Sequence, residues 1–142
     1  MIDTIGSDHA PHLPSEKEGI YTKAPSGLPS IQQSLPVLLT IAAQEEIPLT
    51  RIAAVFSENA AGLYQLNRGK LKEGYEADIV IFDYDKEFTV RNVDQYSKCG
   101  WTPYEGKTLK GYIQTVFVNG QIILENGRIT DHIPCGRPLE FR

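Results

Sequence analysis

The residues of this chain that could carry chemistry lie near its amino terminus. Asp8, His9 and His12 fall within residues 8–12, and the whole chain contains three histidines. An aspartate can bind a metal ion through a hard oxygen or accept a proton, and a histidine can supply a nitrogen ligand or donate a hydrogen bond to an anion. The cluster predicts a candidate site for such chemistry. The alternative is an aspartate that caps local amides beside two solvated histidines.

The chain around this cluster is expected to be extended. Residues 2–7 are short and half apolar, which is typical of a strand, and Pro11 disfavours helical geometry at Ala10. The cluster should therefore lie where a strand ends. Residues 13–30, which hold three prolines, two glycines and the charged run 16–18, predict a long irregular loop. Loops of this length are usually functional or disordered, and we expect the charged run to be solvated.

Two helices should follow the loop. The first is predicted to start with Ser34 as its cap, because Pro36 then lies in the first turn, where proline is tolerated. Its apolar positions share one face: Ile31, Leu35, Leu38 and Ala42. The second helix is expected to open at Thr50 and to end before residues 67–69, where Asn-Arg-Gly is a stop signal.

Strand signals dominate after residue 67. The apolar run within Asp78–Asp83 is typical of a strand covered on both faces. Residues 116–124 predict a hairpin whose two-residue turn is Asn119-Gly120, and Asn126-Gly127 predicts a second turn. Residues 131–142 should form irregular surface chain.

Bulk composition excludes several classes of protein. The chain has 142 residues and a formal net charge of −4, and 41% of its residues are hydrophobic, as in ordinary globular proteins. An acidic excess argues against nucleic-acid binding, which needs a basic face. No apolar run has the length of a membrane span, and residues 1–6 do not resemble a secretory signal. We therefore expect a cytoplasmic protein with neither a nucleic-acid nor a membrane partner.

Three segments together resemble the carboxyl-terminal third of the dihydroorotase family of cyclic amidohydrolases. They are Gly-Ser-Asp-His-Ala-Pro-His at 6–12, Lys-Ala-Pro-Ser-Gly-Leu-Pro at 23–29 and Gly-Tyr-Glu-Ala-Asp-Ile-Val-Ile-Phe-Asp at 74–83. Thr-Pro-Tyr-Glu-Gly at 102–106 is similar to the tail that dihydroorotases share with allantoinases and hydantoinases. The resemblance covers essentially the whole chain, in the family's order.

The resemblance implies roles for individual residues. Asp8 would end the eighth strand of a barrel, bind one metal of a two-zinc site and act as general base and acid. His12 would hold the carboxylate of dihydroorotate, and the backbone of Ser26 and Gly27 would contact the substrate ring, although the family more often has Phe where Ser26 stands. No role transfers to His9, which we interpret as structural or as a support for the metal ligands.

The resemblance also implies a fold that this chain could only complete in part. We expect α/β plus β architecture: residues 1–66 as the last strand and helices of a metal-dependent (β/α)8 barrel, and residues 67–142 as the carboxyl-terminal part of a small composite β-sandwich. Such a barrel needs at least about 200 residues, and no His-x-His pair of the kind that binds the family's zinc occurs here. The chain is thus interpreted as a fragment that is inactive by itself. Residues 1–66 should be poorly ordered or aggregate without the rest.

Two classes of function remain open. The first is a zinc-dependent cyclic amide hydrolase that interconverts dihydroorotate and N-carbamoyl-aspartate in pyrimidine biosynthesis, with a small-molecule substrate and a homo-oligomeric full-length form. Within that class, allantoinase and dihydropyrimidinase or hydantoinase are alternatives, and His12 favours dihydroorotase. The second class is a non-catalytic scaffold that keeps the amidohydrolase fold. A small binding module formed by the strand-rich segment alone is a weaker third possibility.

Overall fold

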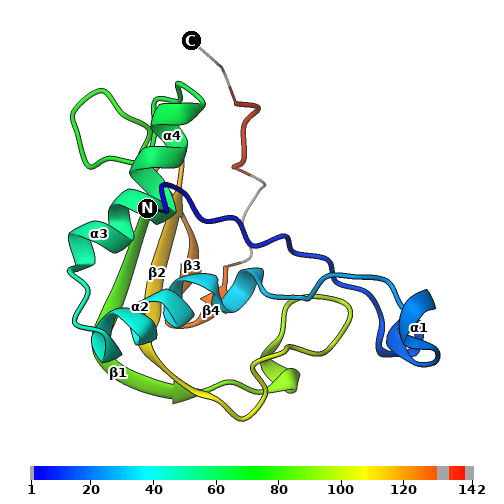
Figure 1. Ribbon diagram of the computed structural model, residues 1–142. Helices are drawn as coiled ribbons and strands as arrows, with labels where there is room; N and C mark the ends of the chain where they lie inside the picture. Colours follow the sequence, from blue (N-terminus) through cyan, green and yellow to red (C-terminus); the bar gives the residue numbers. More distant parts are fainter. Residues whose placement is uncertain (1, 131–134, 140–142) are drawn as a thin grey trace.

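The computed structural model describes residues 2–130 and 135–139 as a layer of helices packed against one antiparallel sheet (Figure 1). The helices are α1 (Pro14–Lys17), α2 (Ser34–Gln44), α3 (Leu49–Ala53) and α4 (Asn59–Leu63), and the strands are β1 (Ile79–Thr89), β2 (Thr108–Val118), β3 (Gln121–Glu125) and β4 (Arg128–Ile129). Short 3-10 turns lie at Tyr21–Lys23, Ile31–Gln33 and Asn92–Asp94. His132 and part of the predicted irregular tail lie outside the described residues.

The sheet has the strand order β1-β2-β3-β4, each pair antiparallel. The predicted hairpin is confirmed: Asn119 and Gly120 join β2 to β3 with φ of 49° and 78°. Positive φ at both central residues is what a tight hairpin turn requires, and Asn-Gly accepts it at little cost. Asn126 and Gly127 form the second predicted turn, again with positive φ.

Strand β1 differs from its prediction in length and in cover. It continues to Thr89 because register shifts after Ile81 and after Asp83 let it bend and go on pairing with β2. The expectation that this apolar run is covered on both faces is wrong for the described residues, since Val80 and Ile81 are 41% and 45% exposed. Only one face of the run meets the helices, and β1 is an edge strand of the sheet.

Helix α2 builds the buried core. Its cap is Gln33 and not the predicted Ser34, so it begins at Ser34, one residue earlier than expected. Pro36 lies in the first turn as predicted, where its missing N–H has no intrahelical acceptor to lose. Leu39 and Ala42 are each 1% exposed and form a cluster with Ile52 of α3. Phe82 and Tyr84 of β1 pack against this cluster. The core is therefore shared between the two segments divided at residue 66.

The second predicted helix is present but irregular. It begins at Leu49, and a π-helical turn, Ala54–Glu58, joins α3 to α4. The extended residues 2–5 lie along it: the Ile5 N–H donates to the Val55 carbonyl at 3.1 Å, and the Asn59 amide donates to the Asp3 carbonyl at 2.8 Å. The predicted strand at residues 2–7 is therefore wrong in this structure. A strand needs a neighbouring strand to pair with, and within the described residues this segment has helix carbonyls and side chains instead.

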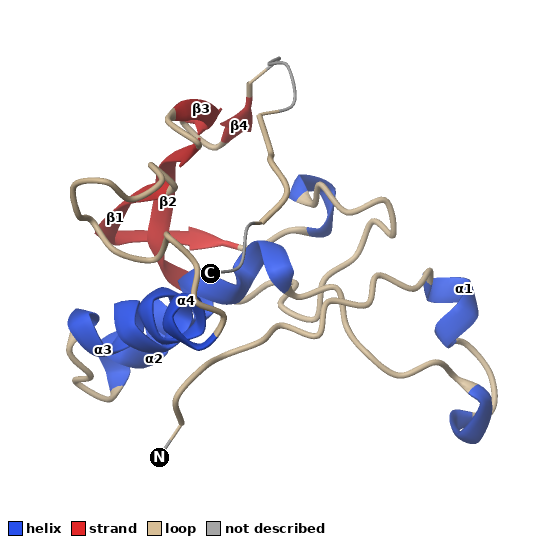
Figure 2. Cartoon of the chain, turned by 90° about the horizontal axis from the view of Figure 1, so that it is seen from above, coloured by secondary structure: helices blue, strands red, loops and turns tan. Residues whose placement is uncertain are grey.

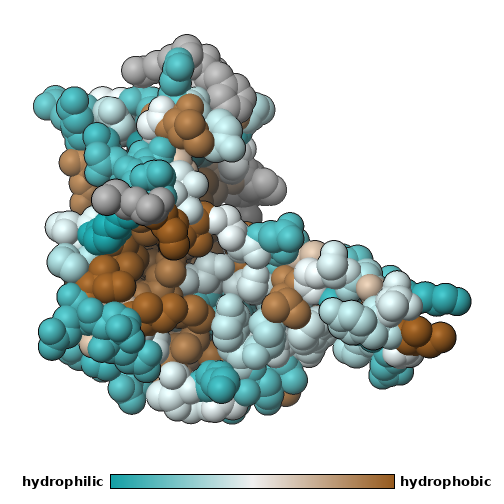
Figure 3. Space-filling view, viewed as in Figure 1, coloured by the Kyte–Doolittle hydropathy of each residue, from teal (hydrophilic) through white to brown (hydrophobic). Residues whose placement is uncertain are grey.

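The long loop at residues 13–30 projects from the body as an arm (Figure 2). The arm carries the short helix α1 and the 3-10 turn Tyr21–Lys23, and its Tyr21 is 92% exposed. Apolar side chains also gather over the helical layer (Figure 3), where Ile41, Leu49 and Leu63 are exposed. Within the described ranges, none of the helices combines the length and the apolar character needed to cross a membrane.

Candidate functional site

The candidate site is built where the base of the arm returns to the chain that carries Asp8. The Ala10 N–H donates to the Leu28 carbonyl at 3.1 Å, and His9 and Leu28 form an isolated parallel bridge. The hydroxyl of Ser30, a buried residue, donates to the Ser7 carbonyl at 3.0 Å. These contacts hold residues 7–10 beside residues 28–30, so the cluster predicted from the sequence lies on a fixed backbone.

Asp8 has an unusual backbone conformation within this arrangement. Its φ is 43°, in the left-handed region that non-glycine residues seldom occupy, although Asp and Asn tolerate it better than most. Such conformations persist where the surrounding contacts determine them, and they concentrate at functional sites. The Asp8 side chain is exposed in this structure. Among the described residues, its carboxylate takes part in no hydrogen bond or ion pair.

The two histidines of the cluster have different surroundings. His9 is half-buried, and its Nδ1 accepts a hydrogen bond from the Ile31 N–H at 3.3 Å, so the ring supports the start of the helical segment. This contact agrees with the structural interpretation of His9. His12 Nδ1 lies 3.8 Å from a carboxylate oxygen of Glu16, four residues further along the chain. The two side chains form an ion pair when the imidazole is protonated.

Gly27 approaches the Asp8 segment closely. Its φ is +95°, and a Cβ at this position would lie 2.4 Å from the Ala10 Cβ and 3.9 Å from the Asp8 carbonyl oxygen. Only glycine fits this combination of dihedral and space. The structure thus brings the backbone of Gly27 against that of Asp8 and Ala10, while Ser26 beside it is exposed.

Lys17 corrects the expectation that the charged run 16–18 is a solvated face. Its ammonium donates to the Pro25 carbonyl at 2.7 Å and to the Gly27 carbonyl at 2.6 Å, and the residue is half-buried. Glu16 also has a local partner, since its carboxylate accepts the Leu13 N–H at 2.6 Å. No periodicity could have indicated Lys17, because its acceptors are main-chain atoms of an irregular loop.

The segment after β1 supports the same region from a distant part of the sequence. The Trp101 indole N–H donates to the His12 carbonyl at 2.8 Å. Gln33, which is 3% exposed, donates to the Gln95 side chain at 3.0 Å and accepts from the Thr102 hydroxyl at 3.2 Å. The Trp101 side chain is half-buried in this segment. Its hydrogen bond adds a specific link to the His12 backbone.

The described residues do not provide a complete metal site. They contain no group of three or more His, Cys, Asp or Glu side chains placed to hold one ion. Tight zinc sites in proteins use three or four such ligands. Among the described residues, Asp8 can therefore be at most one ligand of a site that needs several.

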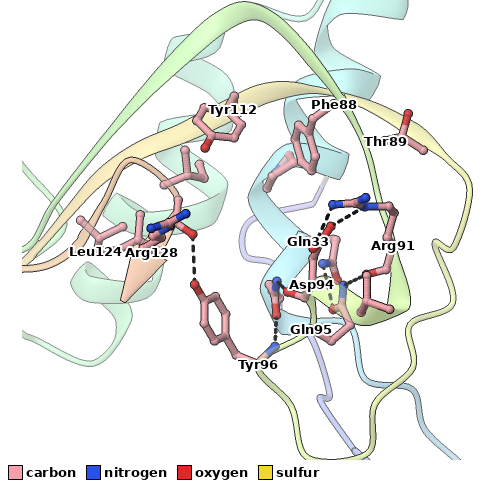
Figure 4. Close-up of a pocket in the computed structure, with 16 residues that line it drawn as sticks. Gln33, Phe88, Thr89, Arg91, Asp94, Gln95, Tyr96, Tyr112, Leu124 and Arg128 are labelled. Atoms are coloured by element: carbon pink, nitrogen blue, oxygen red, sulfur yellow. Dashed lines mark hydrogen bonds and ion pairs between the residues drawn. The ribbon is translucent and has the colours of Figure 1, made fainter. Parts of the chain in front are cut away.

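The larger of two described grooves lies away from the predicted residues, between the start of α2 and the sheet (Figure 4). Its volume is about 990 Å³, and its lining includes Phe88, Tyr96 and Tyr112. Arg91 donates to Asp94 at 2.8 Å in this groove, and that hydrogen bond raises the pKa of Arg91 above its usual value. Because none of the predicted site residues lines it, the groove offers no counterpart to the Asp8 cluster.

Comparison with known proteins defines the class of protein. The sequence pattern of the amidohydrolase family matches residues 1–123, and the chain belongs to this family. Among curated relatives, the chain is 36% identical over 126 residues to the dihydroorotase of Clostridium acetobutylicum, and 42% identical over 108 residues to the dihydroorotase of Methanosarcina mazei. These matches cover 88% and 74% of this chain, but only 30% and 24% of the relatives.

Solved structures agree on the fold. The chain superposes on a D-hydantoinase (dihydropyrimidinase) from Thermus sp. with a TM-score of 0.84 at 25% identity, and on the L-hydantoinase from Arthrobacter aurescens with 0.83 at 30% identity. Each match covers 90% of this chain, and 29% and 30% of the respective structures. The family resemblance read from residues 6–12, 23–29 and 74–83 is thereby confirmed. The chain spans less than a third of the length of these relatives.

Proposed function

We propose that this chain is the carboxyl-terminal part of a zinc-dependent cyclic amide hydrolase and that its substrate is dihydroorotate, interconverted with N-carbamoyl-aspartate. The observation that carries the proposal is the 36% identity over 126 residues to a dihydroorotase, in a chain whose Asp8 segment is held against the Gly27 turn. In this proposal, residues 1–66 supply the end of a barrel and residues 67–142 part of a β-sandwich.

The proposed roles follow the chemistry of the side chains. Asp8, with its exposed carboxylate, would accept a proton during attack on the ring carbonyl, return it to the departing amide nitrogen, and contribute one ligand to a two-zinc site. Zinc would supply Lewis-acid stabilisation of the developing negative charge. The remaining ligands would come from outside this chain, so the chain by itself should not turn substrate over.

Substrate recognition would use the other predicted residues. His12 is placed to donate a hydrogen bond or a positive charge to the carboxylate of dihydroorotate, and Ser26 and Gly27 would offer backbone groups to the ring. In the structure, the His12 Nδ1 lies 3.8 Å from the Glu16 carboxylate, which a substrate carboxylate would have to replace as its partner.

A second candidate function is hydrolysis of a neutral ring, as the names of the superposed hydantoinases suggest. This candidate is favoured by the L-hydantoinase structure, on which the chain superposes with a TM-score of 0.83 at 30% sequence identity. This activity would not need a residue that binds a substrate carboxylate. The two candidates therefore differ in what His12 does, and a comparison of charged and neutral substrates separates them.

The test is an assay of the zinc-loaded enzyme that contains this chain on dihydroorotate, allantoin and hydantoin. We expect turnover of dihydroorotate in preference to the other two, and a fall of about 10²- to 10⁴-fold when Asp8 is replaced by Asn, the range for loss of a positioned acid–base group. Preference for hydantoin would support the second candidate. Activity that survives Asp8→Asn would contradict the proposed role of Asp8.

A further inference from the structure

Lys17 ties the arm to the turn that carries Ser26 and Gly27. It lies in the short helix α1 and reaches two carbonyls eight and ten residues further along, those of Pro25 at 2.7 Å and Gly27 at 2.6 Å. These acceptors lie on either side of Ser26. A single ammonium therefore spans the predicted substrate-contacting pair.

The energetics of this contact favour a fixed turn. An ammonium has three donors and no acceptor, and two of its donors are used here on neutral carbonyls in a half-buried position. Hydrogen bonds from a charged donor are shorter and about twice as strong as neutral ones. The contact offsets the conformational entropy that residues 25–27 lose when the turn is ordered.

The turn is held from its other side as well. The close approach of Gly27 to Ala10 and the hydrogen bond from the Ala10 N–H to the Leu28 carbonyl at 3.1 Å place it beside the Asp8 segment. Without Lys17, the described contacts that attach the turn to the Asp8 segment would be those of Gly27, Leu28 and Ser30. The outer part of the arm could then swing about that attachment.

We propose that Lys17 is a positioning residue, whose ammonium holds the Pro25–Gly27 carbonyls so that the Ser26–Gly27 backbone presents a preformed surface to the ring of a cyclic amide substrate. We call the two hydrogen bonds from the Lys17 ammonium to the Pro25 and Gly27 carbonyls the clamp. The catalytic consequence of this inference rests on the proposed function, but the clamp itself does not. Lys17 needs no contact with substrate in this arrangement. Its effect is transmitted through the two carbonyls.

The first experiment tests the clamp by itself, in the enzyme that contains this chain, through a readout that does not depend on activity. Amide hydrogen exchange at Ala10 is compared among the unchanged chain, Lys17→Met and Lys23→Met, because the Ala10 amide bonds to Leu28 next to the turn. Lys23 is an exposed lysine of the same arm and serves as the matched control. We expect exchange at least about tenfold faster in Lys17→Met only, because this change removes two charge-assisted hydrogen bonds. Equal exchange in all three chains, or no protection in the unchanged chain, overturns the clamp.

The second experiment tests its consequence in the zinc-loaded enzyme that contains this chain. Lys17→Met should raise KM for dihydroorotate about tenfold with kcat changed less than about twofold, as expected when binding shared by substrate and transition state is lost. Lys23→Met should leave both constants unchanged. Unchanged KM in Lys17→Met, or a fall in kcat alone, overturns the positioning role. An unchanged enzyme that fails to hydrolyse dihydroorotate contradicts the proposed function, whereas the exchange experiment still decides the clamp.

Discussion

At the scale of single residues, the Asp8–His12 cluster divides into side chains that support the backbone and side chains that remain available. His9 accepts a hydrogen bond from the Ile31 amide, and the His12 carbonyl accepts one from the Trp101 indole. The Asp8 carboxylate is exposed, and Glu16 is the ion-pair partner of the His12 imidazole among the described residues. His9 therefore has a structural contact, and recognition of substrate by His12 stays a proposal.

This division predicts different effects for two alanine substitutions in the zinc-loaded enzyme. His12→Ala should raise KM for dihydroorotate by about tenfold to hundredfold, the effect of one lost hydrogen bond to a charged group, and leave a neutral ring unaffected. His9→Ala should affect both substrates alike, because it removes a backbone support. Steady-state kinetics on dihydroorotate and hydantoin check this. Equal loss on both substrates in His12→Ala would contradict the carboxylate role.

At the scale of elements, the fold depends on how closely α2 approaches β2. Gly111 makes the approach possible: its φ is +81°, and a Cβ there would lie 2.3 Å from Leu39 Cδ1. The Lys110 N–H also donates to the Thr40 hydroxyl at 2.9 Å. Helix and strand are thus joined by the most buried leucine of the core and by a direct hydrogen bond.

Gly111→Ala should therefore be strongly destabilising. We expect the free energy of unfolding to fall by about 2–4 kcal/mol, the combined effect of an unfavourable dihedral and an overpacked core. Gly106→Ala is the matched control, since its φ is +74° but a Cβ there meets nothing within 4 Å. It should lower stability by only about 1–2 kcal/mol. Urea denaturation followed by circular dichroism gives both values, and equal losses would show that the contact with Leu39 contributes nothing.

The elements also show which parts of the structure local sequence can predict. The Asn119-Gly120 hairpin and the start of α2 were predictable because turn chemistry and the position of Pro36 act over a few residues. The conformation of residues 2–7 could not be predicted in this way, because a strand forms only beside a partner strand, which local sequence does not reveal. The clamp by Lys17 and the bond from Trp101 to His12 were equally hidden. Both depend on tertiary contacts between irregular segments.

At the scale of the whole molecule, the helices and the sheet form one body and the arm stands apart from it. Phe82 and Tyr84 of the sheet pack on the cluster of Leu39, Ala42 and Ile52, so residues 31–63 share a core with the strands. Residues 13–30 contribute no buried hydrophobic side chain to that core. The expectation that all of residues 1–66 are poorly ordered in isolation can be narrowed on this basis to the arm, residues 13–30.

Limited proteolysis of the 142-residue chain with chymotrypsin tests this narrower expectation. The first cut should follow Tyr21, which is 92% exposed in the arm, whereas the 1% exposed Leu39 of α2 should resist cleavage because it lies in the shared core. Tyr21→Ser should delay the first cut without changing the later ones, as read by mass spectrometry. Early cleavage within α2, around the 1% exposed Leu39, would show that the helical layer opens independently of the sheet. In that case the boundary at residue 66 would separate two units of different stability, as the sequence alone predicted.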